Sequence, residues 1–271
     1  HYLTEGDAEG EVRAHVGLGN IWRRLGKVES AQDEWEQALR LYRAQGNEWG
    51  AGLVLNNLGA VMIDAGDYES ALGYHQQALS LRRRLGDRHG EGSSLNNLAI
   101  THYLLGSYEQ AHEYATEAIA LARDIGERSW LVSFLETATR IELARRNYEE
   151  ADRLCAEGLA LSEEIGDRHN GAFYCHSAGE IHLARGEMEA ARDAFDRACR
   201  LRRELSERGN LAASLAGRAL AYLGLGDKEA ALSDARESLA LLKETGQAGE
   251  YITLEVQRRA RMVQAECAGR E

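Results

Sequence analysis

LNNLAITHYLLGSYEQAHEYATEAIALARDIG, residues 95–126, contains two amphipathic helical patterns joined by the short polar turn Gly106-Ser107-Tyr108. In the first pattern, Leu95, Leu98 and His102 recur at the spacing of one helix face. In the second, small residues such as Ala111 and Ala118 lie on the apolar stripe, where they allow another helix to approach closely. The stretch therefore predicts a pair of packed helices.

The same pattern recurs at steps of 40 residues along the whole chain. A glycine stands in the turn of each unit except the fourth, which has Arg146: Gly26, Gly66, Gly106, Gly186 and Gly226. An alanine follows five residues after each turn position: Ala31, Ala71, Ala111, Ala151, Ala191 and Ala231. A leucine follows ten residues further on: Leu41, Leu81, Leu121, Leu161, Leu201 and Leu241. A fixed period of this length is typical of solenoids, whose units bury their apolar faces only by stacking.

The period predicts an all-α protein of six helix pairs followed by a C-terminal capping helix, all in one array over residues 1–271. The six repeats are expected at 8–46, 47–86, 87–126, 127–166, 167–206 and 207–246. Their first helices are expected near 8–25, 48–65, 88–105, 128–145, 168–185 and 208–225. Their second helices are expected near 28–45, 68–85, 108–125, 148–165, 188–205 and 228–245. The capping helix is expected at 248–268, where Tyr251, Ile252, Val256, Met262 and Val263 form an apolar stripe and Arg258, Arg259 and Arg261 a polar outer face. Leu3-Thr4-Glu5-Gly6 aligns with the end of a repeat, which indicates a piece of a longer array or a multidomain protein.

Turn residues mark the helix ends. Glycine can adopt positive φ and end a helix, so Arg146 and Ser206, which replace two of these glycines, are expected to give less ideal turns that are still formed. Side chains suited to capping the next helix follow several turns: Asn47, Asp67, Asp87, Asp167 and Asp227.

Composition narrows the class of partner. The chain has no proline, as expected for a nearly all-helical protein, and 44% hydrophobic residues. Its formal net charge of −12 argues against nucleic acid or an anionic membrane as main partner. No apolar run reaches the length of a membrane span, and no signal peptide is recognised, so we expect a cytoplasmic protein.

The side chains that could perform chemistry are better explained by packing. The four cysteines have no C-x-x-C spacing, and Cys155 and Cys199 take apolar positions of the repeat, as small hydrophobic residues would. His102 and His182 occupy its aromatic core position. The sequence contains neither a glycine-rich phosphate loop nor an H-E-x-x-H motif. We therefore expect no metal, no cofactor and no enzymatic activity.

The repeat resembles the tetratricopeptide repeat, whose pattern is a large residue, Leu, Gly or Ala and an aromatic in the first helix, then Ala, aromatic, Ala in the second. In the second repeat these places hold Leu55, Leu58, Gly59, Met62, Ala71, His75 and Ala78. Departures are Thr139 and Glu142 in the fourth repeat and Arg218, in place of leucine, in the sixth. The 40-residue unit resembles those of Pins-type adaptors, kinesin light chains and bacterial STAND-type regulators. The resemblance implies a right-handed α-α superhelix whose first helices line a concave groove.

In this family the groove holds an extended or helical segment of a partner. Carried over to this chain, the groove residues are Arg13, Asn20, Arg23, Arg24, Asn56, Asn57, Asn96, Asn97, Tyr103, Arg140 and His176. The four paired asparagines are mediocre helix formers, and a carboxamide can both donate to and accept from a peptide backbone. The alternative is that they bond a neighbouring helix or water.

These observations favour a non-catalytic protein-interaction scaffold, the sensor or recognition part of a larger bacterial signalling protein. The arginines of the first helix could bind an acidic partner segment, or they form a solvated face. Two other functions stay open: an oligomerisation or structural module that stacks through its open N-terminal end, and a small-molecule sensor.

Overall fold

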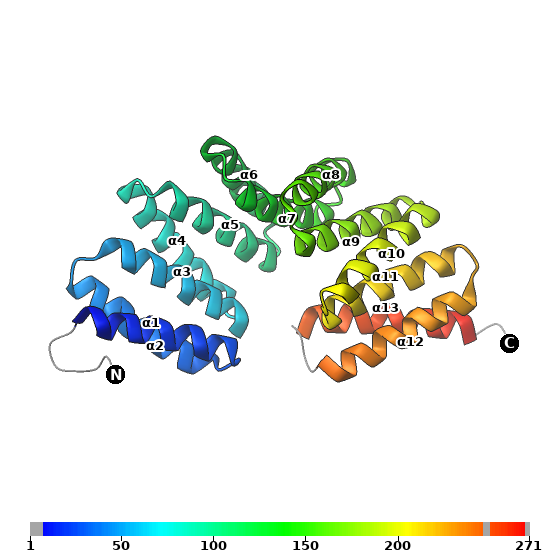
Figure 1. The fold of residues 1–271 in the computed structure, drawn as a ribbon, viewed down its shortest axis with the longest axis horizontal. Coiled ribbons are helices and arrows are strands. Elements are labelled where there is room, and N and C mark those ends of the chain that lie inside the picture. The colour runs from blue at the N-terminus through cyan, green and yellow to red at the C-terminus, as the bar shows by residue number, and fades with distance from the viewer. Residues whose placement is uncertain (1–7, 246–249, 269–271) are drawn as a thin grey trace. The chain divides into compact units, whose positions relative to one another are not determined.

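The computed structural model describes residues 8–245 and 250–268, and all regular secondary structure in these ranges is α-helical (Figure 1). The first helices of the six repeats are α1 (Ala8–Arg24), α3 (Glu48–Ala65), α5 (Arg88–Leu104), α7 (Arg128–Ala144), α9 (Arg168–Arg185) and α11 (Arg208–Gly224). The second helices are α2 (Val28–Ala44), α4 (Tyr68–Leu85), α6 (Tyr108–Ile125), α8 (Tyr148–Ile165), α10 (Met188–Glu204) and α12 (Lys228–Thr245). A final helix, α13, spans Glu250–Ala268. The predicted ends of the twelve repeat helices agree with these bounds to within one residue. The opening match at Leu3-Thr4-Glu5-Gly6 lies outside the described residues.

The two turns without glycine are formed, as predicted. Arg146 and Ser206 both have φ of 59°, in the left-handed region that Gly106 occupies with φ of 74°. A side chain in this conformation brings its Cβ close to the backbone, at a cost of roughly 1–2 kcal/mol. The bond that closes the turn is retained, because the N–H of Asn147 donates to the carbonyl oxygen of Glu142 at 2.9 Å. These turns are therefore strained but intact.

Side chains cap five helices at the predicted positions. In each case the side-chain oxygen accepts a hydrogen bond from the backbone N–H three residues on; for Asp87 the acceptor lies 2.9 Å from the nitrogen of Gly90. The five capping residues are Asn47, Asp67, Asp87, Asp167 and Asp227. Each cap satisfies one N–H group that the helix itself leaves without a partner, which fixes where the helix begins.

Within a repeat, an aromatic ring of the second helix packs against a glycine of the first helix. The indole of Trp35 lies so close to Gly19 that a Cβ there would be 2.5 Å from it, and the ring of Phe195 lies in the same way against Gly179. The alanine of each second helix is completely buried, at Ala31, Ala71, Ala111, Ala151, Ala191 and Ala231. A larger residue at these places would overpack the contact, which confirms the geometric reason for small residues in the repeat.

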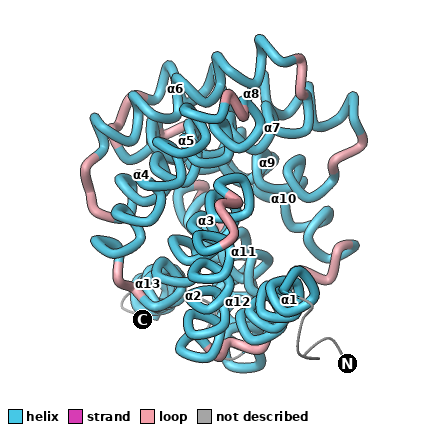
Figure 2. Tube along the Cα trace, turned by 90° about the vertical axis from the view of Figure 1, so that its left-hand side faces the viewer, coloured by secondary structure: helices cyan, strands magenta, loops and turns pink. Residues whose placement is uncertain are grey.

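Contacts divide the chain into two compact units, the first ending at Glu127 and the second beginning at Arg128. Within each unit the second helix of one repeat packs on the first helix of the next, as α2 does on α3 and α8 on α9. First helices of successive repeats also contact each other directly: α3 with α5, α7 with α9, and α9 with α11. Short loops join all the described repeat helices (Figure 2). The fold class, an all-α solenoid of helix pairs, is confirmed, whereas a single array over the whole chain stays a prediction.

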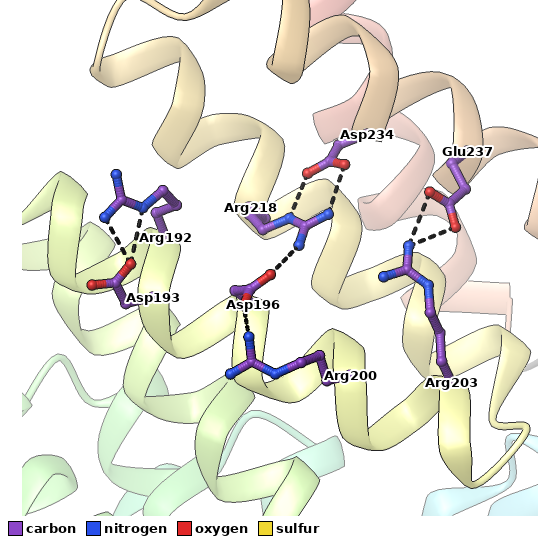
Figure 3. A network of polar contacts seen from close by, with 8 residues as sticks. All are labelled: Arg192, Asp193, Asp196, Arg200, Arg203, Arg218, Asp234 and Glu237. Atoms are coloured by element: carbon purple, nitrogen blue, oxygen red, sulfur yellow. Dashed lines mark hydrogen bonds and ion pairs between the residues drawn. The ribbon is translucent and has the colours of Figure 1, made fainter.

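Arg218, the departure in the sixth repeat, belongs to an ion-pair network in which its pair with Asp234 is buried (Figure 3). Its Nε donates to Oδ2 of Asp234 at 2.7 Å and its Nη2 to Oδ1 of Asp234 at 2.9 Å. Its Nη1 donates to Asp196 at 2.7 Å, and Asp196 in turn contacts Arg200. Arg218 and Asp234 are 8% and 5% exposed, so charge pairing between α11 and α12 replaces the apolar contact of the other repeats.

In the fourth repeat, the polar residues Thr139 and Glu142 take positions that are small or aromatic in the repeat pattern, and both form hydrogen bonds. Thr139 is buried and its hydroxyl donates to the carbonyl oxygen of Leu135 at 2.8 Å. Glu142 is 1% exposed and accepts hydrogen bonds from Arg145 and Asn147, both at 2.8 Å. These bonds meet the requirement that buried polar groups be paired, so α7 keeps its helical form.

The capping helix α13 is confirmed by its packing on α11 and α12, but two predicted details are wrong. Val256, Ala260 and Val263 form the buried stripe, while Met262 is 47% exposed. Met262 lies about 100° around the helix from Val263, so it cannot share that face. Arg259, expected on the outer face, is half-buried and paired with Glu180 of α9. The side chains of Tyr251 and Ile252 lie outside the described residues.

Candidate functional site

The predicted binding residues lie on the first helices of the repeats, in two sets that belong to different units. We call the surface formed by α1, α3 and α5 the unit 1 A-helix face, and the surface formed by α7, α9 and α11 the unit 2 A-helix face. Unit 1 carries Arg13, Asn20, Arg23, Arg24, Asn56, Asn57, Asn96, Asn97 and Tyr103, and unit 2 carries Arg140 and His176.

Asn56 is engaged inside unit 1. Its Nδ2 donates to Oγ of Ser94 in α5 at 3.0 Å, and the Ser94 hydroxyl lies 3.2 Å from its Oδ1. The ring of His75 in α4 approaches the same Oδ1 at 3.4 Å. Asn56 therefore makes the contact with a neighbouring helix that the sequence left open as an alternative, and it connects three helices.

The other three asparagines differ in how much of their hydrogen-bonding capacity is used. Oδ1 of Asn96 is buried and finds no donor among the described residues, a situation that costs about 1–3 kcal/mol. Asn57 and Asn97 are half-buried, and only the backbone carbonyl of Asn97 has a side-chain donor, Thr101 at 2.8 Å. No described residue bonds the side-chain amides of Asn57 and Asn97, which leaves both with donors and acceptors to offer.

The basic character of α1 is reduced by internal ion pairs. Arg23 donates from Nε to Asp64 of α3 at 2.6 Å, and Arg13 lies 3.4 Å from Glu9, one helical turn away. Arg24 and Asn20 are exposed. Only part of the positive charge predicted at this end is therefore available to a partner.

Aromatic contacts position one predicted residue in each unit. The ring of Tyr103 lies 5.9 Å from that of Tyr108 at the turn between α5 and α6. In unit 2, the guanidinium of Arg140 stands 5.3 Å from the ring centroid of Phe173 and bonds Glu136 at 2.7 Å. Both side chains are held by neighbours, so they present defined surfaces.

His176 lies at the centre of a polar cluster in unit 2. Its Nδ1 is 3.1 Å from Oγ of Ser214, and its ring packs at 5.4 Å against Phe195. Burial lowers the pKa of His176 well below its ordinary value, and the positive charges of Arg202 and Arg259 act in the same direction. The imidazole is therefore neutral at neutral pH and serves as a hydrogen-bonding and packing group.

Two arginines that sequence reasoning missed complete this cluster. Arg259 of α13 bonds Glu180 at 2.6 Å, and Glu180 lies 3.9 Å from Nε2 of His176. Arg202 of α10 is buried and donates to Ser214 at 2.6 Å, and its burial lowers its pKa to about 10. No sequence signal links these residues, because they come from four helices whose side chains meet only after packing.

Two kinds of reactive site are relevant to the described residues: metal sites and buried thiols. Among them, no group of three or more histidine, cysteine, aspartate or glutamate side chains could hold a metal ion. Burial raises the pKa of Cys155 to about 12 and of Cys199 to about 11, and it also raises the pKa of Cys175, so thiolates are scarce. None of the described helices combines the length and apolar character needed to cross a bilayer. The arrangement is suited to binding through hydrogen bonds, charge and apolar contact.

Comparisons with known proteins agree with this geometry. The model of the tetratricopeptide repeat matches residues 10–84 and, again, 50–124. No match was found among curated protein sequences. A STAND protein (signal transduction ATPase with numerous domains) with a tetratricopeptide repeat sensor, from Pyrococcus horikoshii, superimposes with a TM-score of 0.77 at 15% identity, over 97% of this chain and 40% of that one.

Two further solved structures share the fold. A Rap protein complexed with competence and sporulation factor gives a TM-score of 0.67 at 18% identity, covering 94% of this chain and 67% of that one. BtubC (BKLC) from P. vanneervenii gives a TM-score of 0.66 at 16% identity, covering 91% and 95%. At these identities the likeness extends to the fold alone.

Proposed function

Because the chain is a tetratricopeptide-repeat protein, we propose that it is a non-catalytic scaffold that binds a peptide or helical segment of a protein partner on its A-helix faces. The repeat family is in general an interaction module, and no cluster of His, Cys, Asp or Glu among the described residues could hold a metal ion. In this proposal the unit 1 A-helix face makes the main backbone contacts, and Arg140 and His176 are candidate contact residues of the separate unit 2 A-helix face.

The observation that supports this proposal most strongly is the pair Asn57 and Asn97. They stand 40 residues apart on α3 and α5, two helices that contact each other, and no described residue bonds their side-chain amides. Each carboxamide can donate to a peptide carbonyl and accept from a peptide N–H, whatever the peptide's own side chains. Two such groups on adjacent helices suit a segment that runs across the helix axes.

The setting we propose is the recognition part of a larger bacterial signalling protein. One structure with this fold is a STAND protein with a tetratricopeptide repeat sensor, and another is a Rap protein complexed with competence and sporulation factor. The repeat of the first protein is described as a sensor, and the second protein is complexed with a factor. A partner segment with acidic residues near α1 would meet Arg24, since Arg23 is already paired with Asp64.

The proposal is tested by selecting binders from a displayed random-peptide library and measuring their affinity by isothermal titration calorimetry. The double variant Asn57→Ala/Asn97→Ala should bind the selected peptides about tenfold more weakly or worse, because each lost hydrogen bond is worth about 1 kcal/mol. The matched control is Gln37→Ala/Gln110→Ala, which removes two exposed carboxamides from the second helices α2 and α6.

Binding on this face would be contradicted if both double variants lost the same amount of peptide affinity. It would also be contradicted if the Asn57→Ala/Asn97→Ala variant bound the selected peptides as tightly as the wild type. Asn56 is a poor choice for the test, because its removal also breaks the contact with Ser94. A loss of affinity there would mix binding with stability.

A second function, self-association through α1, is favoured by two exposed apolar side chains of that helix. Leu18 and Ile21 are 38% and 52% exposed, whereas their equivalents one repeat later, Leu58 and Val61, are completely buried. Light scattering should then show a mass that rises with concentration for the wild type and is constant for Ile21→Glu. The control Leu85→Glu alters an equally apolar exposed residue of α4 and should leave the association unchanged.

A further inference from the structure

A hollow of about 720 Å³ opens between α2, α3 and α4, on the side of unit 1 that bears the second helices. Tyr42, Leu55 and Leu81 supply its apolar wall, and two arginines, Arg43 and Arg84, stand among its lining residues. The hollow is separate from the asparagines of the A-helix face, none of which lines it. It is therefore a surface distinct from the proposed binding face.

The equivalent place one repeat later is largely filled. There the hollow between α5 and α6 measures about 280 Å³ and is lined by Glu91 and Glu117. Arg83 of α4 bonds Glu91 at 2.8 Å and also pairs with Glu117. Ala51 takes the position of Glu91 in the larger hollow, so both the bulk and the negative charge of that side chain are missing.

Arg43 lacks the carboxylate that its equivalents have. Each of three corresponding pairs between successive second helices joins an arginine to a glutamate: Arg83 to Glu117, Arg203 to Glu237 and, with the order reversed, Arg197 to Glu163. In the larger hollow the partner position holds Gln77, whose Oε1 lies 3.4 Å from Nη2 of Arg43. No carboxylate of a described residue is within ion-pair distance of Arg43.

A charge reversal adds a second arginine to the same place. The pair Glu48–Arg84, at 2.5 Å, has its arginine at the end of the second helix. In the four later repeats the arginine opens the first helix instead, as in Arg88–Asp124, Arg128–Glu164, Arg168–Glu204 and Arg208–Glu244. Two arginines and one glutamate thus give the larger hollow a net charge of +1, in a chain whose net charge is −12. At the equivalent positions of the smaller hollow, Arg83 and Arg88 stand against Glu91, Glu117 and Asp124, which gives a net charge of −1.

We propose that this hollow binds an acidic segment of a protein partner, with one Asp or Glu carboxylate taking the place beside Arg43 that Glu117 takes beside Arg83. A guanidinium binds a carboxylate through charge-assisted hydrogen bonds, which are stronger than the neutral contact with Gln77. An apolar side chain next to the carboxylate packs on Tyr42, Leu55 and Leu81, and the amides of Gln76 and Asn47 can bond the segment's backbone. The site adds a second docking surface to the proposed scaffold.

The test uses the full chain and two fluorescein-labelled peptides, one of alternating Glu and Leu and one with Gln in place of every Glu. Fluorescence anisotropy should show binding of the Glu peptide and binding about tenfold weaker, or none, for the Gln peptide. Gln77→Glu supplies the internal carboxylate that the other repeats have and should weaken the Glu peptide about tenfold, as should Arg43→Gln. Arg203→Gln removes an arginine at an equivalent position that already has Glu237 and should change nothing.

Absence of Glu-peptide binding, equal affinity for the two peptides, or unchanged binding by Gln77→Glu would overturn the proposal. Gln77 is exposed, so the variant Gln77→Glu should fold as the wild type does. Its circular dichroism spectrum and thermal midpoint check this directly. The double variant Asn57→Ala/Asn97→Ala should bind the Glu peptide as the wild type does. Failure of this site is therefore distinguishable from failure of the A-helix face.

Discussion

Arg259 of α13 makes a two-pronged ion pair with Glu180 of α9, although 79 residues separate them in the chain. Nη1 lies 2.6 Å from Oε1, and Nη2 lies 3.0 Å from Oε2. The side chains are 26% and 21% exposed, so water screens the pair only partly. The contact joins α13 to α9 of the fifth repeat, although α13 packs mainly on α11 and α12 of the sixth repeat.

Removal of this ion pair should loosen α13 before any other helix. We expect Arg259→Met to lower the free energy of opening α13 by about 1–2 kcal/mol, the value of charge-assisted bonds at a partly exposed site. Hydrogen exchange followed by mass spectrometry measures this as faster exchange in residues 250–268. Arg261→Met, which alters an exposed arginine of the same helix, should leave exchange unchanged; identical profiles for the two variants would show that the ion pair does not fix α13.

Replacing only one residue of the pair Arg218–Asp234 should destabilise the protein. Replacing both residues by leucine should change its stability much less. Arg218→Leu leaves the buried carboxylate of Asp234 without its counter-charge and should reduce the free energy of unfolding by about 3–5 kcal/mol. The double variant Arg218→Leu/Asp234→Leu should recover most of that loss, because Leu58 and Leu154 occupy these two positions in other repeats. Urea unfolding of the single and double variants gives the coupling energy. Additive losses would mean that the two residues act independently.

His75 should make unit 1 less stable in mild acid. It is completely buried, and burial lowers its pKa to about 4, below about 6.5 in an unfolded chain. Between these values the unfolded chain binds more protons than the folded one, so the stabilisation present above about pH 6.5 is lost as the pH falls toward about 4. From about pH 7 to about pH 5 the loss at this site should be about 2 kcal/mol.

The variant His75→Phe isolates that contribution. Phe195 occupies the equivalent position in the fifth repeat and packs on Gly179, so the ring has a precedent in this chain. Urea unfolding at about pH 7 and about pH 5 should show a smaller acid-induced loss for the variant by about 2 kcal/mol. Equal losses for both proteins would mean that His75 is protonated in the folded state.

The four cysteines should differ in their reaction with an alkylating agent. Cys155, Cys175 and Cys199 are buried, and burial raises the pKa of each thiol, whereas Cys267 is partly exposed. Iodoacetamide should therefore modify Cys267 at least about tenfold faster than the other three in the native protein, and all four at similar rates in urea. Peptide mass mapping over time measures this order. Early modification of Cys155 in the native protein would contradict its burial.

Much of the fold could be read from the sequence because its signals are local. The 40-residue period, the turn glycines and caps such as Asp87 placed the repeat helices to within one residue. The departures at Glu142 and Arg218 were visible as misfits to the pattern. Their partners were not, because Asn147 and Asp234 look like ordinary turn and surface residues until the helices pack.

The candidate site was much less accessible to sequence reasoning. The match between repeats selected the asparagines of α3 and α5, but it could not show that Asn56 bonds Ser94 while the amides of Asn57 and Asn97 stay unbonded. It also selected Arg23 as a binding residue, and the structure pairs Arg23 with Asp64. The hollow beside Arg43 required a comparison of repeats in three dimensions, since its distinguishing feature is the neutral Gln77 on the next second helix.

The sequence by itself determined the helices, their turns and their order, because helix formation and capping depend on residues a few positions apart. Only the tertiary structure decided which polar side chains neutralise one another and which remain available, as the contrast between Arg83 and Arg43 shows. The physical reason is that the contacts Arg83–Glu117 and Arg43–Gln77 join residues 34 positions apart, so they form only once the second helices have packed side by side.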